Sequence, residues 1–370
     1  MRVRRVWWVA VALALVGFAA PVARAQGYVE REVTIPWVQA SPNGLDALQV
    51  YFDAPGKHPL VVMTHGSSRK PEEHLNMTPW SLLPEALWFA RRGWFVVVVV
   101  RRGYGRSSGE QDGRHGGRCP GPDYYSAAKY SAEDLAQVID YARALPQVDT
   151  SRVMAVGVST GGLATVALTA NAPAGLIAGI SFAGGRGSKS EHDVCDSGNL
   201  VHAFKDLGKS SRTPMLWLYA ENDKFFWPEL THKFDEAFRS QGGQDELVIA
   251  PAIGDDGHSL FRHPEAWGET VSKWLNAHGL APLEQLYPEV RSPDVATPDG
   301  LSESGTEAFH SYLLLGPHKA FAKSAHGFGY AIARLSTDEA RKTALENCKK
   351  ATSDGSPCAV VNVDNAPVAP

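Results

Sequence analysis

The sequence predicts an α/β fold: a doubly wound, mostly parallel eight-stranded sheet followed by a small C-terminal α+β module. Three observations lead to this prediction. Strand-like and helix-like segments alternate from about residue 28 to residue 279, as in folds whose helices cover both faces of a sheet. Several strand segments are unbroken apolar runs such as FVVVVV, which suit a parallel sheet buried on both sides. With 44% hydrophobic and 21% charged residues, the 370-residue chain has the composition of a globular protein.

The expected elements follow one another in a regular order. The first two strands have no helix between them and open the sheet as an antiparallel hairpin, whereas each later strand-helix-strand repeat implies a right-handed crossover. The expected strands are residues 28–33, 47–52, 60–64, 95–100, 152–158, 176–182, 215–219 and 247–250. The expected helices are residues 84–92, 126–145, 160–171, 228–240 and 263–278.

The first 25 residues have the pattern of a secretory signal peptide. MRVRR is cationic, residues 6–20 are almost continuously apolar, and Ala23-Arg24-Ala25 fits the small-x-small cleavage pattern. A retained membrane anchor is the alternative, but the apolar run is shorter than the roughly 20 residues of a spanning helix and Pro21 interrupts it. We expect cleavage after Ala25, a periplasmic or extracellular protein, and no membrane span after signal removal.

The charge of the mature chain argues against nucleic acid as a partner. Removal of residues 1–25 takes away four arginines and no acid, so the formal net charge changes from -4 to -8. Binding to a phosphate backbone requires a basic surface. Nucleic acid is therefore not expected among the partners of this chain.

Four cysteines in an exported chain indicate disulfides, because oxidising compartments allow them to persist. Cys119 and Cys195 each lie in an excursion beyond the carboxyl end of a strand, so we expect them to pair and tie these excursions into a lid. Cys348 and Cys358 are expected to pair within the small C-terminal module, which can bury little core. The cysteines form no C-x-x-C pair and no histidine cluster at zinc spacing lies near them, so no metal site is expected.

A proline-rich segment divides the chain. The expected parts are a large domain over residues 26–280, a linker over residues 281–305 with four prolines, and a small module over residues 306–370. In the module, two short strands flank His326-Gly327, and a helix opens with Ser336 and Glu339 in capping-box spacing. The segment SPCAVVNVD forms a closing strand.

The stretch GVSTGG places a serine at a junction between a buried strand and a helix. Gly157, Ser159 and Gly161 form the pattern G-x-S-x-G, in which glycines relieve crowding at a tight turn and the serine is held at the carboxyl edge of the sheet. An ordinary helix N-cap is the alternative, and it explains the serine but not the glycines. Ser159 is therefore the expected nucleophile.

A serine nucleophile needs a base and an acid that orients the base. In this context the partners are expected in the order serine, acid, histidine, each after a later strand. Asp223 is favoured over Glu221 as the acid because it lies a few residues beyond the strand end. His258 follows the last strand in a glycine-rich loop, whereas His263 precedes a proline and resembles a helix start.

Backbone amides are the usual donors to the oxyanion of such a reaction. We expect the N–H groups of Thr160, which follows the nucleophile, and of Ser67 in the segment HGSS, for which a plain turn is the alternative. The arginines of RRGYGRSSGEQDGR could bind a substrate carboxylate. Pairing with Glu110, Asp112 and Asp123 is the alternative and is favoured.

In this order, the segments HGSS, RRGYGRSSG, GVSTGG, YAEND and DDGH resemble the α/β-hydrolase superfamily over about residues 28–279. Within it they are similar to dienelactone-hydrolase-like and prolyl-oligopeptidase-like serine hydrolases. The resemblance implies a Ser-His-Asp hydrolase of esters or amides with no metal or organic cofactor, and makes residues 26–280 the catalytic domain. Two departures matter: dienelactone hydrolases carry a cysteine where Ser159 stands, and prolyl oligopeptidases carry a propeller before the catalytic domain, whereas here the expected sheet begins almost at the mature amino terminus. The C-terminal module resembles a small module of secreted bacterial proteins without an established activity.

The leading functional hypothesis is a secreted serine hydrolase that cleaves carboxylic esters through an acyl-enzyme. A serine exopeptidase or oligopeptidase of the prolyl-oligopeptidase-like type is the alternative, so the expected substrate is a small-molecule ester or a peptide. A non-catalytic binding protein on the same fold is a third hypothesis.

Overall fold

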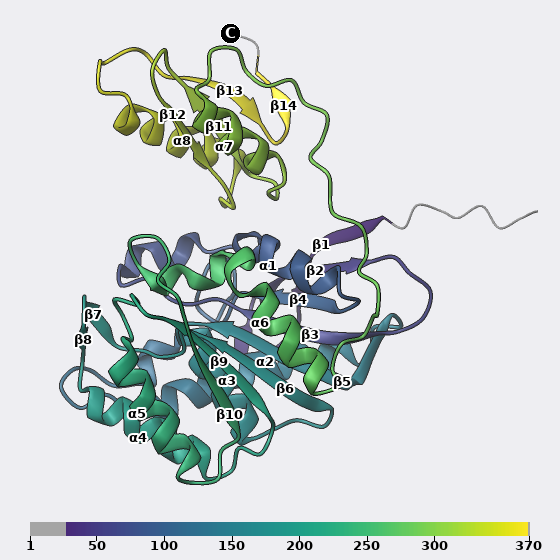
Figure 1. The fold of residues 1–370 in the computed structure, drawn as a ribbon, viewed down its shortest axis with the longest axis vertical. Helices are drawn as coiled ribbons and strands as arrows, with labels where there is room; N and C mark the ends of the chain where they lie inside the picture. The colour runs from purple at the N-terminus through teal and green to yellow at the C-terminus, as the bar shows by residue number, and fades with distance from the viewer. Residues whose placement is uncertain (1–26, 369–370) are drawn as a thin grey trace, which may run out of the picture.

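A computed structural model describes residues 27–368 of the chain, so the expected signal peptide lies outside the described residues. Its centre is an eight-stranded sheet in the order β1-β2-β4-β3-β5-β6-β9-β10 (Figure 1). The two pairs at one edge of the sheet, β1 with β2 and β2 with β4, are antiparallel. The remaining pairs are parallel. The strands are β1 (Tyr28–Ile35), β2 (Leu45–Phe52), β3 (His58–Thr64), β4 (Phe95–Val99), β5 (Val148–Val158), β6 (Leu176–Phe182), β9 (Met215–Ala220) and β10 (Asp245–Ala250). The predicted doubly wound, mostly parallel sheet is confirmed.

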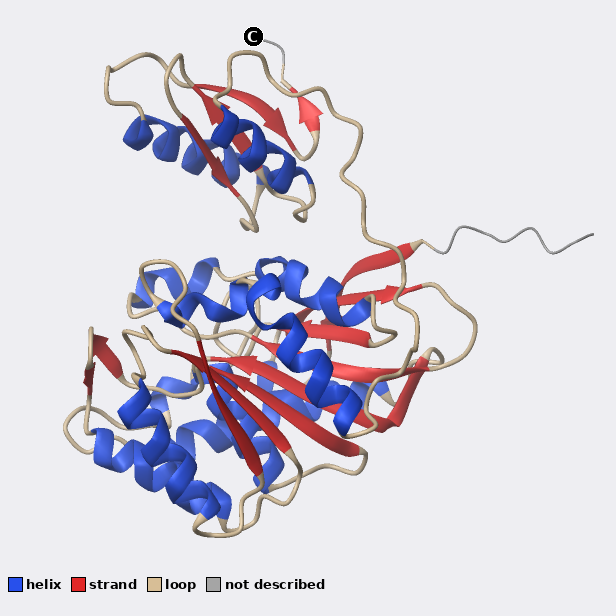
Figure 2. Ribbon diagram, in the orientation of Figure 1, coloured by secondary structure: helices blue, strands red, loops and turns tan. Residues whose placement is uncertain are grey.

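Helices cover both faces of this sheet (Figure 2). One face packs against α1 (Leu83–Ala90) and α6 (Pro264–Ala277), and the other against α2 (Tyr124–Ala142), α3 (Thr160–Ala170), α4 (Ser197–Gly208) and α5 (Pro228–Arg239). The position of β4 in the sheet explains why its sequence is apolar throughout. Val96 and Val98 point into the core under α1 and α6, while Val97 and Val99 point into the core under the other four helices. A strand buried on both faces has no position for a polar side chain.

Helix α4 and a short hairpin were not expected from the sequence. Leu200, Phe204 and Leu207 recur at helical spacing and are fully buried, and the side chain of Asp196 accepts a hydrogen bond from the N–H of Asn199 to cap the helix. From the sequence alone, this segment is predicted only as an excursion that contains Cys195. The hairpin of β7 (Ser188–Ser190) and β8 (Asp193–Val194) precedes α4.

A second, four-stranded sheet follows the proline-rich segment, in the order β12-β11-β13-β14 and antiparallel throughout. Its strands are β11 (Ala320–Lys323), β12 (Phe328–Ala331), β13 (Ala359–Val363) and β14 (Ala366–Pro367), with helices α7 (Glu303–Leu313) and α8 (Thr337–Ala351) on opposite faces. Successive side chains of β11 point to opposite faces of this sheet. Ala320 and Ala322 pack under α8, whereas Phe321 packs under α7. Helix α7 begins within the last residues of the expected linker.

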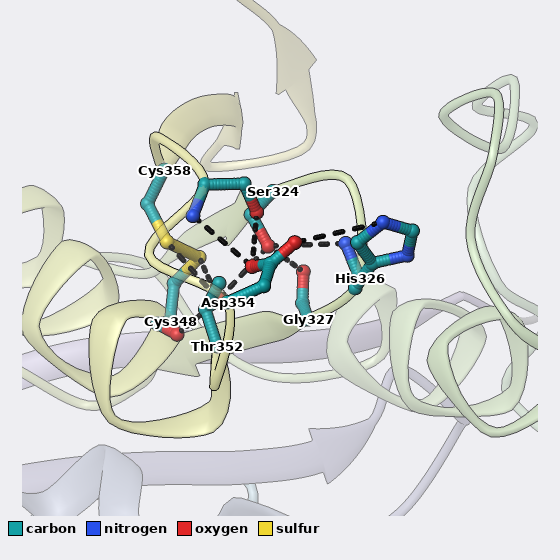
Figure 3. The surroundings of a disulfide bond; sticks show 8 residues. Ser324, His326, Gly327, Cys348, Thr352, Asp354 and Cys358 are labelled. Atoms are coloured by element: carbon teal, nitrogen blue, oxygen red, sulfur yellow. Dashed lines mark hydrogen bonds and ion pairs between the residues drawn. A yellow bond between two sulfur atoms is a disulfide. The ribbon is translucent and has the colours of Figure 1, made fainter.

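The disulfide between Cys348 and Cys358 joins the end of α8 to the start of β13 (Figure 3). Thr352 lies beside it, where its hydroxyl donates to the carbonyl of Cys348 at 2.8 Å and contacts the hydroxyl of Ser324 at 2.8 Å. These contacts tie the turn before β12 to the end of α8. The pair is the one expected from the sequence.

Replacing both Cys348 and Cys358 by serine is expected to lower the free energy of unfolding of this module by about 2–3 kcal/mol. The disulfide closes a loop over a sequence separation of 10 residues, and a loop of that length loses about this much conformational entropy in the unfolded chain. Urea unfolding followed by limited proteolysis of the module measures the change. Ser353→Ala, an exposed site in the same loop, is the matched control, and equal midpoints for the two variants would contradict the prediction.

Candidate active site

Ser159 lies in a strained turn between β5 and α3. Its φ is 55° and its ψ is -119°, a conformation that costs a non-glycine residue free energy and that recurs at functional sites. The neighbouring glycines have a steric reason. A Cβ on Gly157 would collide with the carbonyl oxygen of Gly161, and a Cβ on Gly161 would collide with the carbonyl oxygen of His65. The turn therefore requires the two glycines that the sequence pattern contains.

The structure brings Ser159, His258 and Asp223 together at the carboxyl edge of the sheet. His258 Nε2 lies 3.1 Å from Ser159 Oγ, and His258 Nδ1 lies 3.2 and 3.1 Å from the two carboxylate oxygens of Asp223. These distances are within hydrogen-bonding reach for proton transfer. The two weighed rivals lie elsewhere: Glu221 is exposed, and His263 contacts Glu265 at 3.0 Å next to the start of α6.

The Asp223 carboxylate is fixed by its surroundings. It is fully buried, and its Oδ1 accepts hydrogen bonds from the N–H groups of Phe225 at 2.7 Å and Phe226 at 2.9 Å. The ring of Phe225 stacks on the imidazole of His258 with centroids 3.8 Å apart. Asp256 Oδ1 accepts hydrogen bonds from the N–H groups of Lys224 and His258, both at 3.0 Å. The acid and histidine loops are thus held together by backbone contacts as well as by the side-chain pair.

Ser67 and Thr160 lie beside the serine hydroxyl. Gly66 approaches Ser159 so closely that a Cβ on it would lie 2.9 Å from the serine Cβ, and Ser67 lines the cavity next to Ser159. Thr160 is the first residue of α3, where an N–H has no intrahelical partner. Within residues 27–368, neither amide donates a hydrogen bond to a protein acceptor. Both are free to donate to a bound group.

Arg101 joins His65, two residues before Ser67, to the side chain of Thr160, a role that sequence reasoning missed. Its guanidinium donates to the carbonyl of His65 and, at 2.9 Å, to the hydroxyl of Thr160. Its side chain is 1% exposed, so it cannot bind a substrate carboxylate. Its position directly after β4 was visible in the sequence, but its partners come from β3 and α3.

The imidazole of His65 supports the same loop. Its Nε2 accepts a hydrogen bond from the N–H of Arg101 at 3.0 Å, which assigns the proton to Nδ1 and makes it a donor to the carbonyl of Gly66 at 2.6 Å. Burial, with the nearby Arg101 charge, lowers the pKa of His65 well below its ordinary value. The ring is therefore neutral and acts as a fixed spacer under Gly66 and Ser67.

The remaining loop charges are structural, as the favoured alternative expected for most of them. Asp112 is buried, lies 3.7 Å from Arg101 and 2.8 Å from Arg186, and accepts hydrogen bonds from Ser131 at 2.7 Å and Tyr104 at 2.8 Å. Burial acts to raise the pKa of Asp112, but the two guanidinium groups outweigh it and hold the pKa well below its ordinary value.

Three other charges of this region have different partners. Arg114 pairs with Glu110 at 3.3 Å, as that alternative proposed. Asp123 caps α2 by accepting from the N–H of Ser126, and Arg102 pairs with Asp134 of α2, a partner the sequence analysis did not name.

Two cavities meet at Ser159. The larger has a volume of about 890 Å³ and includes Ser67, His258 and residues of the C-terminal module. The smaller has a volume of about 340 Å³ and is lined by Thr160, Arg186 and the pair Cys119 and Cys195, which the structure joins as a disulfide. This disulfide therefore lies at the wall of a cavity next to the serine, the place expected for it.

Residues 27–368 contain no group of three or more histidine, cysteine, aspartate or glutamate side chains placed to hold a metal ion. None of the helices in this part of the chain is long and apolar enough to cross a membrane.

One family model and several solved structures are similar to parts of this chain. The family described as X-Pro dipeptidyl-peptidase (S15 family) matches residues 53–224, and none of the curated proteins matches the chain. Similar solved structures include a protein of Klebsiella pneumoniae assigned as a dienelactone hydrolase, with 17% identity, 68% of this chain and 99% of that chain covered and a TM-score of 0.48. An esterase of Pyrococcus furiosus has 17% identity, coverage of 68% and 93% and a TM-score of 0.46. The acylaminoacyl peptidase of Pyrococcus horikoshii has 18% identity, coverage of 72% and 43% and a TM-score of 0.48.

Proposed function

We propose, from the premise that the chain is a member of the α/β-hydrolase superfamily, that it is a secreted serine hydrolase which cleaves carboxylic esters. The observation that carries the proposal is the continuous chain of contacts from the buried carboxylate of Asp223 through His258 to the hydroxyl of Ser159. An unassisted serine hydroxyl is a poor nucleophile, and this arrangement supplies the base that activates it.

In the acylation half of the reaction, Ser159 Oγ forms a bond to the ester carbonyl carbon while His258 Nε2 takes the hydroxyl proton. The carbonyl electron pair moves to oxygen, and the amides of Ser67 and Thr160 donate to the resulting oxyanion. Asp223 accepts from Nδ1–H, which keeps the ring in the required tautomer and stabilises the imidazolium. Collapse of the intermediate breaks the ester bond, and His258 returns the proton to the leaving alcohol.

Deacylation repeats the same steps with water in place of serine. His258 Nε2 removes a proton from water, the hydroxide forms a bond to the acyl carbonyl carbon, and the same two amides stabilise the oxyanion. The bond to Ser159 Oγ then breaks, the serine regains its proton from the imidazolium, and the carboxylic acid leaves. Arg101 is a positioning residue here, because it holds Thr160 and the His65 loop at fixed separation without touching the substrate.

A peptidase is the second candidate, and the match to the S15 family favours it. The charges around the serine favour the ester. An exopeptidase needs acidic side chains that bind the amino terminus of a peptide. Two carboxylates line the larger cavity, and one of them, Glu73, is paired with Lys70 at 3.3 Å. The other, Glu339, has no cation within 4 Å among residues 27–368.

Export is proposed on two independent grounds. The N-terminal segment has the composition of a cleavable signal, and the chain carries two disulfides, which persist in oxidising compartments. A periplasmic or extracellular location satisfies both.

The test of the proposed function is turnover of 4-nitrophenyl acyl esters together with labelling by a fluorophosphonate, a reagent that reacts with activated serines. We expect hydrolysis of short acyl esters and a single covalent adduct on the peptide that contains Ser159, measured by mass spectrometry. Aminoacyl and dipeptidyl nitroanilides, assayed in parallel, decide between ester and peptide hydrolysis. Labelling without turnover of any ester, but with turnover of a nitroanilide, would favour the peptidase. Absence of labelling would leave a binding protein on a hydrolase fold.

A further inference from the structure

The larger cavity at Ser159 has one wall that does not come from the catalytic sheet. Its inner wall is formed by residues around Ser67 and by the loop of His258, and its outer wall by Ile332, Ala333 and Arg334, with Glu339 and Thr343 of α8. The three loop residues connect β12 to α8 in the C-terminal module, which lies over the carboxyl edge of the main sheet in Figure 1. The module is thus part of the space in which a substrate would bind.

The outer wall is held in place by specific contacts. The hydroxyl of Thr78 donates to the carbonyl of Ala333 at 3.0 Å, and Arg106 donates to the carbonyl of Leu335 at 2.8 Å. Gly316 lies so close to the ring of Trp80 that a Cβ would collide with it. The loop between β12 and α8 is therefore anchored at both of its ends to the large domain.

Backbone strain marks the same loop. Ala333 has a φ of 51°, a left-handed conformation that costs alanine about 1 kcal/mol or more. Such a conformation persists only where the surrounding contacts impose it, and here the hydrogen bond from Thr78 lies on this residue. The strained residue directly precedes Arg334 in the wall of the cavity.

The charges that line the cavity are unbalanced. Lys70 and Glu73 neutralise each other. Three arginines, Arg69, Arg262 and Arg334, line the cavity with no carboxylate within 4 Å among residues 27–368, against one carboxylate, Glu339, without a cation partner. The cavity therefore attracts an anion.

Among these three arginines, Arg334 has a buried nitrogen without a hydrogen-bond acceptor within residues 27–368. Its Nε is buried and has no hydrogen-bond partner in the described part of the chain, whereas the guanidinium of Arg69 stacks on Phe225 and donates to Ser188 at 2.7 Å. A buried donor without an acceptor is unfavourable. A carboxylate is the ligand that matches a guanidinium best, because it accepts two parallel hydrogen bonds.

We propose that the C-terminal module completes the substrate site and that Arg334 makes the enzyme selective for esters that carry a free carboxylate away from the scissile bond. The inference rests on the proposed function, since it assigns a substrate class to the same serine. The volume of about 890 Å³ accommodates such a molecule between Ser159 and the module. The ester is cut by the serine, and the second acid group is bound by Arg334.

The experiment compares two esters of equal chain length, methyl hexanoate and monomethyl adipate, which differ in a terminal methyl against a carboxylate. Methanol release gives kcat/KM for the wild type, Arg334→Ala and Arg334→Lys. We expect Arg334→Ala to lower kcat/KM for monomethyl adipate about 10-fold or more, to change the value for methyl hexanoate less than about 2-fold, and Arg334→Lys to restore part of the loss. Lys342→Ala, an exposed cation on α8 of the same module, is the matched control and should change neither.

Each other outcome decides the inference. Equal losses on the two esters in Arg334→Ala would overturn it, because the side chain would then act only on the structure of the wall. Labelling of Ser159 by the fluorophosphonate, with no difference between wild type and Arg334→Ala on monomethyl adipate, would overturn it and leave the proposed function standing. A wild-type protein that neither reacts with the fluorophosphonate nor hydrolyses methyl hexanoate would overturn both the proposed function and the role of Arg334.

Discussion

Replacing Ser159 by alanine is expected to abolish ester hydrolysis, with a loss in kcat of about 10,000-fold or more. The variant keeps His258, Asp223 and the amides of Ser67 and Thr160, but it has no atom that can form the acyl bond. Initial rates with 4-nitrophenyl butyrate, measured at high protein concentration, give the residual activity. The fluorophosphonate adduct should disappear with it.

The control for this variant is a serine of the strand that precedes Ser159. Ser151 lies near the start of β5, away from the turn that holds Ser159, and is exposed, so Ser151→Ala should hydrolyse the ester at the wild-type rate. Both variants should melt near the wild-type temperature, because alanine fits the turn as serine does. Ester turnover by Ser159→Ala within 10-fold of wild type would refute the assignment of the nucleophile.

Asp112→Asn is expected to cost about 3–5 kcal/mol of folding free energy at pH 7, the largest stability effect predicted for the chain. The substitution leaves two guanidinium groups, those of Arg101 and Arg186, without their shared carboxylate in a buried site. The single amide oxygen of asparagine can still accept from Tyr104, but its NH2 group cannot accept from Ser131, so the variant loses the charge and one accepted hydrogen bond. Urea unfolding of both proteins measures it.

The pH dependence of this difference has a defined sign. The pKa of Asp112 is depressed in the folded protein below its ordinary value of 3.8, so its contribution is present above about pH 4 and is lost as the pH falls further. The gap in unfolding free energy between wild type and Asp112→Asn should therefore narrow between pH 5 and pH 3. Glu110→Gln is the control, since Glu110 pairs with Arg114 at the exposed surface and should change stability by less than about 1 kcal/mol. A gap that widens on acidification would contradict the assignment.

The sequence predicted all eight strands of the large sheet because their signals are local. Each buried parallel strand is an apolar run bounded by polar or glycine-rich turns, and β6 (Leu176–Phe182) has the predicted bounds. The two short strands around His326-Gly327 were visible for the same reason. The positions of Ser159, Asp223 and His258 followed from chain order alone, since each comes after a strand at one edge of the sheet.

Other features were missed because they depend on contacts between distant segments. The apolar spacing of α4 was present, but glycine, serine and charged residues surround it and weaken the local signal. The connection from Arg101 to His65 and Thr160 joins three strand ends, which no sequence window contains. The contribution of Ile332 and Arg334 to the cavity depends on how the module docks, and the linker sequence carries no information about that docking.

The β12–α8 loop lines the cavity although it lies far along the chain from Ser159, Asp223 and His258. The proposed reacting groups follow strand ends in the first three quarters of the chain, while one wall of the cavity is formed by a segment near the C-terminus. Insertions, deletions or substitutions near Ala333 should therefore change substrate preference without altering the positions of the proposed catalytic residues. Natural variation in substrate preference among related chains should accordingly concentrate in this late segment, and the sheet should vary far less.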